Sequence, residues 1–370
     1  MNQQEAAAAL SVWVALESPT NHPAGLNGMM DLVQKDVAGL PIAVERIPGR
    51  DGLGDMVMLR AGLDNGQPAV AVMSHLDTVH PVGTSAKELP VKIDGDRLYG
   101  PGVYDMKGGA WLALQAFKQV AVAGTAKRPM VFLFTPDEEI GSPTSRAVIE
   151  QIGKGSAAVL VTEPAREGGK IVTARKGVGR FDVKLEGRPS HAGSRHADGR
   201  SAIREAAHQI LAIEGMTDYA RGITTSVALM GGGTAANVIP QHAWFSVDCR
   251  VTTLADGEAM EKRVLGLKAH DPDVAIRITG GMNRPPYEKL PMVAELFEVA
   301  RKVAAGVGFE LQDCPMTGGG SDGNFTAALG VPTLDGLGID GDGAHTLQEY
   351  ALISSIAPRQ ALIKGLLETV

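Results

Sequence analysis

The chain has 370 residues, which is long for a single domain, so its length predicts two domains with ample sequence to bury a core. It carries 35 lysines and arginines against 42 aspartates and glutamates, a formal charge of -7. This balance provides no basic surface for nucleic acid or an anionic membrane, and it favours a small-molecule partner. The two cysteines, Cys249 and Cys314, are too far apart for a C-x-x-C spacing, so neither a disulfide framework nor a thiolate metal site is predicted.

The N-terminal segment, MNQQEAAAALSVWVALESPTN, has no basic leader and carries Glu5 before its apolar residues. This apolar stretch of about a dozen residues is too short to span a bilayer, and we interpret it as an amphipathic helix. No longer apolar run occurs in the sequence, so we expect a soluble, cytoplasmic protein. An export signal that has been removed, and so is missing from this sequence, is the alternative to a cytoplasmic location.

The segment from residue 68 to residue 161 alternates short β-rich runs with helical patterns. In order these are AVAVMS, MKGGAWLALQAFKQV, MVFLFT, a helical stretch at 146–152, and AAVLV. Strands separated by helices indicate βαβ units and a largely parallel sheet covered on both faces. The fold class predicted for this part is therefore α/β.

A different pattern begins near Gly179. It reads strand (RFDVKLEG), helix (200–213), two strands (TTSVALMGG and HAWFSVDCRV), helix (257–269) and strand (VAIRITGG). This β-α-β-β-α-β order is typical of a ferredoxin-like α+β unit. After Pro286 the alternation resumes, with a helix at 293–305 and a strand at 331–334. We therefore predict a core domain of residues 1–178 and 286–370 with an inserted domain of residues 179–285.

Acids and histidines follow several of the predicted core strands. His75 and Asp77 come after the first strand, Asp105 precedes a helix, and three consecutive acids, 137–139, come after MVFLFT. Glu163 follows the next strand, and His345 occurs late in the chain. Because functional groups gather beyond the carboxyl ends of parallel strands, we expect these residues to meet at one edge of the sheet.

Imidazoles and carboxylates in this combination form a suitable shell for two Zn²⁺ ions, with one carboxylate shared between them. Asp77 lies two residues beyond His75 and can accept the second imidazole N–H, the contact that orients a metal-binding ring.

The sequence resembles the dinuclear-zinc metallopeptidase family that includes glutamate carboxypeptidase (carboxypeptidase G), acetylornithine deacetylase and succinyl-diaminopimelate desuccinylase. The segments that carry the resemblance are SHLDTV, GPGVYDMKGG, PDEEIGS, TEP, GRPSHAG, TGGGSDG and GAH-x-x-x-E-Y. They occur in the family's order between His75 and Tyr350. The resemblance implies a zinc-peptidase core with an inserted lid domain that commonly dimerises.

The resemblance also implies roles for individual residues. His75 and Glu163 correspond to ligands of one zinc, Glu139 and His345 to ligands of the other, and Asp105 to the bridging carboxylate, with a cis peptide after it. Glu138 then remains to take a proton from the attacking water and pass it to the leaving nitrogen. His191, in the inserted domain, corresponds to a donor that stabilises the oxyanion.

The residues that recognise substrate are implied in the same way. Arg284, Asn237 and the loop 317–323, with Gly319 and Gly320, resemble elements that line the substrate pocket in relatives, and an arginine suits a carboxylate. Lys170 matches a lysine that helps bind glutamate. The loop lacks the G-x-x-x-x-G-K-S/T pattern of a phosphate loop.

The sequence features favour a hydrolase that cleaves an N-acyl amino acid or a peptide with a free carboxylate, with C-terminal glutamate as the first choice. The segment 174–177 (ARKG) instead favours the deacetylase and desuccinylase branches, while GPGVYD and the surroundings of Lys170 favour the carboxypeptidase. Glu163, in place of aspartate, favours acyl-amino-acid hydrolases over aminopeptidases and dipeptidases. A non-catalytic binding protein on this fold would be expected to have lost ligands or the base, yet every one is present.

Overall fold

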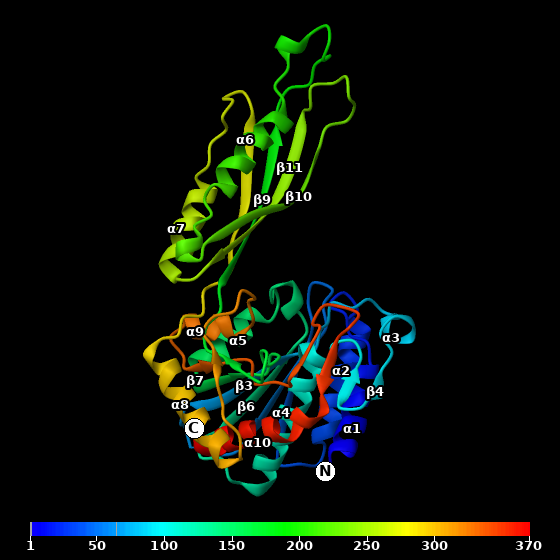
Figure 1. The fold of residues 1–370 in the computed structure, drawn as a ribbon, viewed down its shortest axis with the longest axis vertical. Helices are drawn as coiled ribbons and strands as arrows, with labels where there is room; N and C mark the ends of the chain where they lie inside the picture. Colours follow the sequence, from blue (N-terminus) through cyan, green and yellow to red (C-terminus); the bar gives the residue numbers. More distant parts are fainter. Residues whose placement is uncertain (1, 64) are drawn as a thin grey trace. The chain divides into compact units, whose positions relative to one another are not determined.

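The computed structural model describes residues 2–63 and 65–370. They form two compact units, which Figure 1 shows as ribbons. The first unit contains Met1–Ala174, Lys289–Thr317 and Ser321–Val370, and the second contains Arg175–Glu288 with Gly318–Gly320.

Three segments group differently from the predicted domain division: residues 175–178 and 286–288 extend the inserted domain at its two ends, and a short glycine segment joins it from the core. Gly318–Gly320, which the sequence placed in the core domain, belongs to the second unit. The physical reason is that the carbonyl oxygens of Gly318 and Gly319 accept hydrogen bonds from Arg250 at 3.2 Å and from Arg175 at 3.1 Å.

The first unit is built on a six-stranded sheet with the order β1-β2-β6-β3-β7-β14. Its strands are β1 (Ala43–Ile47), β2 (Met56–Ala61), β3 (Ala69–His75), β6 (Met130–Thr135), β7 (Ser156–Val161) and β14 (Thr333–Leu334). The four strands β6, β3, β7 and β14 are parallel, while β1 and β2 add an antiparallel edge. The predicted, largely parallel α/β core is confirmed.

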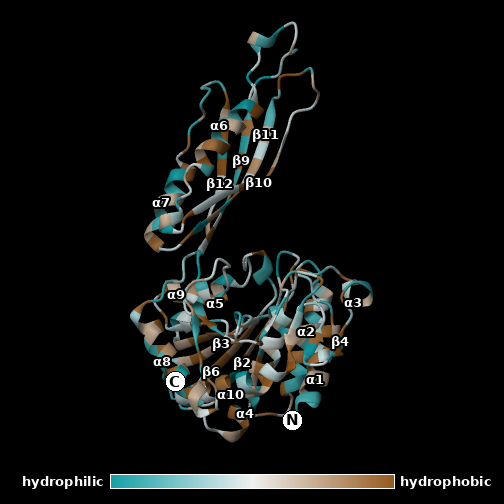
Figure 2. Cartoon of the chain, in the orientation of Figure 1, coloured by the Kyte–Doolittle hydropathy of each residue, from teal (hydrophilic) through white to brown (hydrophobic). Residues whose placement is uncertain are grey.

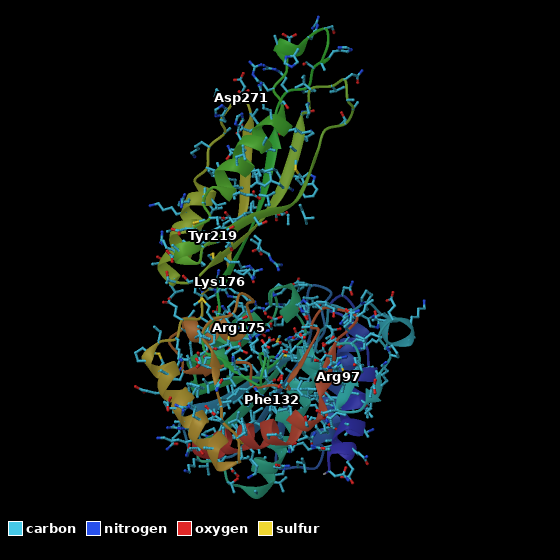
Figure 3. All side chains as sticks on the ribbon, in the orientation of Figure 1. Arg97, Phe132, Arg175, Lys176, Tyr219 and Asp271 are labelled. Carbon is cyan, nitrogen blue, oxygen red and sulfur yellow. The ribbon has the colours of Figure 1, made fainter. Side chains whose placement is uncertain are left out.

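Helices cover both faces of this sheet, because successive strand residues point to opposite sides. On one face, Ile149 of α5 (Arg146–Lys154) and Phe325 of α9 (Gly323–Ala328) join a buried cluster with Leu133. On the other, Phe132 contacts Phe117 of α4 (Gly108–Ala123), with ring centroids 5.8 Å apart. The sheet strands are strongly hydrophobic in Figure 2, and Figure 3 shows Phe132 inside the unit. The sheet is thus a rigid, doubly covered platform for the residues at its edge.

The remaining elements of the first unit surround this core. The helices are α1 (Gln3–Ala15), α2 (Pro23–Val37), α3 (Thr84–Lys87), α8 (Pro291–Gly306) and α10 (Ile353–Thr369), with the short turns η1 (Val103–Lys107) and η2 (Glu138–Ile140). The small strands are β4 (Lys92–Asp94), β5 (Arg97–Tyr99), β8 (Ile171–Val172), β13 (Asp313–Cys314), β15 (Gly341–Asp342) and β16 (Tyr350–Leu352). The predicted N-terminal helix is present as α1, and Asn2 and Glu5 form a capping box at its start.

The second unit contains the predicted ferredoxin-like arrangement. Its elements are β9 (Gly177–Glu186), α6 (Ala202–Glu214), β10 (Thr224–Gly232), β11 (His242–Val251), α7 (Leu254–Leu265) and β12 (Ala275–Arg284), with the short turns η3 (His196–Asp198) and η4 (Tyr219–Arg221). The antiparallel sheet has the order β10-β11-β9-β12. Alternate residues of β9 and β11, such as Phe181 and Phe245, are buried in a core that includes residues of α6 and α7.

No helix at the described positions is both long and apolar enough to cross a membrane.

Candidate metal centre

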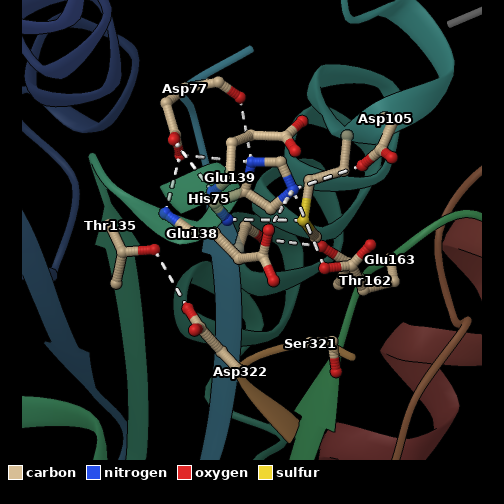
Figure 4. A network of polar contacts seen from close by, with 12 residues as sticks. His75, Asp77, Asp105, Thr135, Glu138, Glu139, Thr162, Glu163, Ser321 and Asp322 are labelled. Carbon is tan, nitrogen blue, oxygen red and sulfur yellow. Dashed lines mark hydrogen bonds and ion pairs between the residues drawn. The ribbon is translucent and has the colours of Figure 1, made fainter. Parts of the chain in front are cut away.

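Three of the five predicted metal-binding side chains lie at the carboxyl ends of three adjacent parallel strands. β3 lies between β6 and β7 in the sheet, and His75 is its last residue. Glu139 follows β6 in the turn η2, and Glu163 follows β7. Because parallel strands end at the same edge, these three side chains come together from distant parts of the sequence, as Figure 4 shows.

His75 presents one ring nitrogen to the carboxylates. Its Nε2 atom lies 3.2 Å from Asp105 and 3.7 Å from Glu163. Its Nδ1 atom lies 2.9 Å from the carbonyl oxygen of Asp77 and 3.4 Å from the Asp77 carboxylate, so the main-chain oxygen, rather than the predicted carboxylate, is the nearer acceptor. A carbonyl oxygen can only accept, so the neutral ring carries its proton on Nδ1 and offers the Nε2 lone pair to a metal.

His345 approaches the same carboxylates from the late segment of the chain. Its Nε2 atom lies 3.3 Å from Asp105 Oδ2 and 3.2 Å from Glu139 Oε2. Asp105 therefore offers Oδ1 to His75 and Oδ2 to His345, the arrangement expected of a shared carboxylate. The peptide between Asp105 and Met106 is cis, which confirms the expectation drawn from the resemblance.

The three consecutive acids have three different surroundings. Asp137 is fully buried and accepts hydrogen bonds from Thr144 and Ser145, which fixes the turn after β6. Glu139 points to His345, whereas Glu138 Oε2 lies 4.0 Å from His75 Nε2. Asp137 thus stabilises the turn, while Glu138 and Glu139 point to different imidazoles of the cluster.

Asp77 holds this turn in place. Its carboxylate is fully buried and accepts the backbone N–H groups of Glu138 and Glu139, both at 3.1 Å, and the hydroxyl of Thr20 at 2.7 Å. Sequence reasoning missed Thr20, which is 57 residues away from Asp77 and belongs to none of the recognised motifs. Asp77 thereby links the end of β3 to the end of β6.

The electrostatics of the cluster favour positive charge. Hydrogen bonds to Asp105 and then to Glu139 raise the pKa of His345 to about 11. Burial raises the pKa of Glu139, a shift that the nearby Asp105 charge reinforces and the His345 hydrogen bond opposes. The two imidazoles lower the pKa of Asp105 despite its burial. These directions show carboxylates crowded together in a site of low solvent access.

The donor set fits metal ions. Two groups of side chains bring ligand atoms within 4.8 Å of one another: His75, Asp105 and Glu139, and His75, Glu138 and Glu163. In addition, Glu139 Oε1 is buried and has no hydrogen-bond partner among the described residues. A buried carboxylate oxygen normally has a partner, and a cation would supply one. Imidazole nitrogens and carboxylate oxygens are ligands that zinc accepts.

The predicted substrate-binding residues lie outside this cluster. Lys170 is in the first unit, where its N–H and carbonyl pair with those of Arg166 in a tight hairpin. Arg284 is 4% exposed at the end of β12 in the second unit, and Gly320 lies against its side chain. Gly319 belongs to the same unit.

His191 and Asn237 lie together in the second unit. The Asn237 carbonyl accepts the N–H of Ala192 at 2.9 Å, which pairs the two segments. His191 is exposed, and its Nδ1 atom accepts the backbone N–H groups of Gly193 and Ser194 at 3.2 and 3.1 Å. An imidazole whose Nδ1 accepts carries its proton on Nε2, so His191 presents an N–H donor to its surroundings.

A parallel sheet with paired imidazoles and a central carboxylate at its carboxyl edge is the kind of site that metal-dependent hydrolases use. The family model of Peptidase family M20/M25/M40 matches residues 71–369, and the chain belongs to this family. It is therefore an enzyme of the metallopeptidase and amidohydrolase class.

Particular relatives agree with this assignment. The chain is 30% identical over 355 residues to carboxypeptidase G2 of Pseudomonas sp. (strain RS-16), covering 94% of this chain and 84% of that protein. It is 26% identical over 368 residues to succinyl-diaminopimelate desuccinylase of Sphingopyxis alaskensis, covering 92% and 93%. An M20 family metallo-carboxypeptidase from Sulfolobus solfataricus shares the fold, with a TM-score of 0.78 at 18% identity and coverage of 100% and 99%.

Proposed function

We propose that this enzyme hydrolyses the amide bond of an N-acyl amino acid or short peptide with a free carboxylate, and that it releases a C-terminal glutamate. The observation that carries the reaction is the cluster in which His75 and His345 share Asp105. The similarity to carboxypeptidase G2 over 94% of the chain supports glutamate as the amino acid.

Five residues would hold two zinc ions. His75 and Glu163 would bind one ion, Glu139 and His345 the other, and Asp105 both. When bound, the ions supply Lewis acidity that polarises the substrate carbonyl and lowers the pKa of water. Glu163 is 6% exposed and lies at the end of a buried strand, so its side chain is held in place before any ion arrives.

Glu138 is the proposed proton carrier. It lies in the same cluster as His75 and Glu163, and its backbone is fixed by the hydrogen bond to Asp77. As the water oxygen attacks the carbonyl carbon, Glu138 takes the water proton; when the C–N bond breaks, it delivers that proton to the leaving nitrogen. His191 donates its Nε2–H to the carbonyl oxygen as negative charge develops there.

His191 and Arg284 lie at opposite ends of one sheet. Arg284 pairs with Val178 near the start of β9, whereas His191 lies beyond Glu186 at the end of β9. The strand between these points spans roughly 25 Å, at about 3.3 Å per residue. A small substrate cannot reach both residues of one chain. If both act on one substrate, they come from two chains.

The second unit offers a surface for such pairing. β10 is an edge strand of its sheet, and Leu229 and Met230 on it are 62% and 56% exposed. Exposed apolar residues on an edge strand favour pairing with another copy about a two-fold axis. We therefore propose a homodimer in which His191 serves the neighbouring active site.

The second candidate activity is removal of an acetyl or succinyl group from an amino acid. It is supported by the 26% identity to succinyl-diaminopimelate desuccinylase over 92% of the chain and by the segment 174–177. The cluster serves either activity, since both break an amide bond beside a carboxylate.

A substrate screen separates these activities. We expect zinc-loaded enzyme to show its highest kcat/KM on N-acyl glutamates, including folate-like conjugates. For N-acetylornithine and N-succinyl-diaminopimelate we expect kcat/KM to be lower by at least about tenfold. This ratio corresponds to a difference of about 1.4 kcal/mol in transition-state binding. A higher kcat/KM on either of those two compounds would establish the second candidate.

Metal content gives another prediction. We expect two zinc ions per chain at saturation, because five ligands including a bridging carboxylate exceed what one tetrahedral ion needs. Elemental analysis of dialysed protein measures the ratio, and chelation should abolish turnover until metal is restored. One equivalent at saturation together with full activity would contradict the two-ion assignment.

Glu138 and Glu139 should respond differently to substitution. Glu138→Gln should retain both ions and the fold but lower kcat by about 10² to 10⁴, the usual effect of losing a positioned proton carrier. Glu139→Ala should weaken metal retention, because it removes a ligand. Metal analysis, circular dichroism and kcat are measured for each variant. If Glu138→Gln lost metal and Glu139→Ala retained it, the roles of ligand and proton carrier would be exchanged.

Complementation tests the shared active site. His191→Ala and Glu138→Ala chains should each be nearly inactive as homodimers, with His191→Ala lowering kcat by about 10² to 10³. Mixed dimers should regain activity, because one of their two sites then contains both His191 and Glu138. Activity is measured on purified mixed dimers carrying different tags. If such dimers form and remain inactive, His191 acts in its own chain or has no catalytic role.

A further inference from the structure

Glu349 lies in the late segment that carries His345 and is almost completely buried, with 1% exposure. It belongs to the GAH-x-x-x-E-Y segment, yet neither the ligand set nor the proton carrier includes it. A buried carboxylate needs hydrogen bonds to offset its lost hydration. Its contacts therefore indicate what it does.

Glu349 accepts four hydrogen bonds. Its Oε1 atom accepts the backbone N–H groups of Tyr104 at 2.9 Å and Asp105 at 3.0 Å. Its Oε2 atom accepts the backbone N–H of Gly102 at 2.9 Å and lies 2.8 Å from His80 Nε2. Three of the four donors are main-chain groups of the turn that carries the central carboxylate.

These contacts join three segments that contribute proposed ligands. The first segment begins at His75 and includes His80, whose imidazole contacts Glu349. The second carries Asp105, whose backbone N–H donates to Glu349. The third is the connection between β15 and β16, which contains both His345 and Glu349. Gly102 has a φ of 70°, in the left-handed region, and a Cβ atom at this position would meet the Thr78 side chain, so the turn requires a residue without a side chain here. One side chain therefore links the imidazole of His80 and the backbone of the Asp105 turn to the segment that carries His345.

We infer that Glu349 is a positioning residue that sets the location of Asp105 and thereby the affinity for both metal ions, an inference that rests on the proposed function. A ligand's orientation depends on the groups that bond to it from outside, and loss of such a partner commonly weakens metal binding by about 10- to 100-fold. Glu349 acts on two sites at once because Asp105 faces both imidazoles.

Glu349→Gln is the informative variant. Both carboxylate oxygens face N–H donors, so a glutamine amide must direct its NH₂ group toward donors in either orientation. The side chain stays nearly the same size, and the defect is the loss of acceptor capacity at the Asp105 turn. Glu205→Gln is a matched control: Glu205 is 2% exposed and accepts the backbone N–H groups of His270 and Asp271, but it lies in the second unit.

The experiment measures stepwise zinc binding by metal-free full-length protein in competition with a chelator of known affinity. We expect Glu349→Gln to weaken both zinc affinities by about 10- to 100-fold. At saturating zinc, kcat should fall while KM changes little. Glu205→Gln should match the wild type in zinc affinity, even if its thermal stability falls.

The outcomes are distinct. If wild-type protein fails to bind two ions, the two-ion assignment of the proposed function fails; if it binds two and Glu349→Gln binds them equally well, the positioning role is wrong. A fall in thermal stability with unchanged zinc affinities would also overturn the role, since it would show a merely structural carboxylate. Should Glu349→Gln not fold, Glu349→Asp decides, because it keeps the charge but is one methylene shorter: at least several-fold weaker zinc binding supports the role, and unchanged binding overturns it.

Discussion

Repulsion among carboxylates at the carboxyl edge of the core sheet is the constraint on which the rest of this structure depends. Asp105, Glu138, Glu139 and Glu163 meet there with two imidazoles at distances of 3.2 to 4.0 Å. Carboxylate oxygens of Asp105 and Glu139, and of Glu138 and Glu163, lie within 4.8 Å of one another, and like charges this close in a partly buried site are unfavourable unless cations or protons offset them. The raised pKa of His345 and the Glu139 Oε1 atom, which has no hydrogen-bond partner in the part of the chain that the structure describes, reflect the same need for positive charge.

The scaffold withstands this repulsion through hydrogen bonds to the main chain around the ligands. Asp77 accepts the N–H groups of Glu138 and Glu139, while Glu349 accepts those of Tyr104 and Asp105. Each of these carboxylates is buried, so its hydrogen bonds act in a medium of low dielectric constant and are correspondingly strong. The negative charges of Asp77 and Glu349 are thus tolerated near an already acidic site, because these hydrogen bonds compensate for them. The same bonds immobilise the turns that carry the ligands.

The sequence was informative where the order of strands and helices determines which site residues meet. The strand preceding His75 and the strand preceding Glu163 are continuous apolar runs, so their parallel pairing and common edge could be predicted from pattern alone. It was less informative where contacts join distant segments. Nothing local distinguishes Thr20 or shows that Glu349 reaches the Asp105 turn, 244 residues away in sequence. Gly319 also belongs to the second unit, unlike most of its neighbours in the chain, because its carbonyl oxygen accepts a hydrogen bond from Arg175.

The second unit shows why motif position alone does not define a site. His191 and Arg284 are both matched by resemblance to residues that act on the substrate, yet β9 separates them by most of its length. A rigid antiparallel sheet cannot shorten that separation by changing side-chain rotamers. The proposed division of substrate recognition between two chains rests on this separation within β9. In the proposed homodimer, dimerisation would be part of the chemistry, because the partner chain would supply a hydrogen-bond donor to each site.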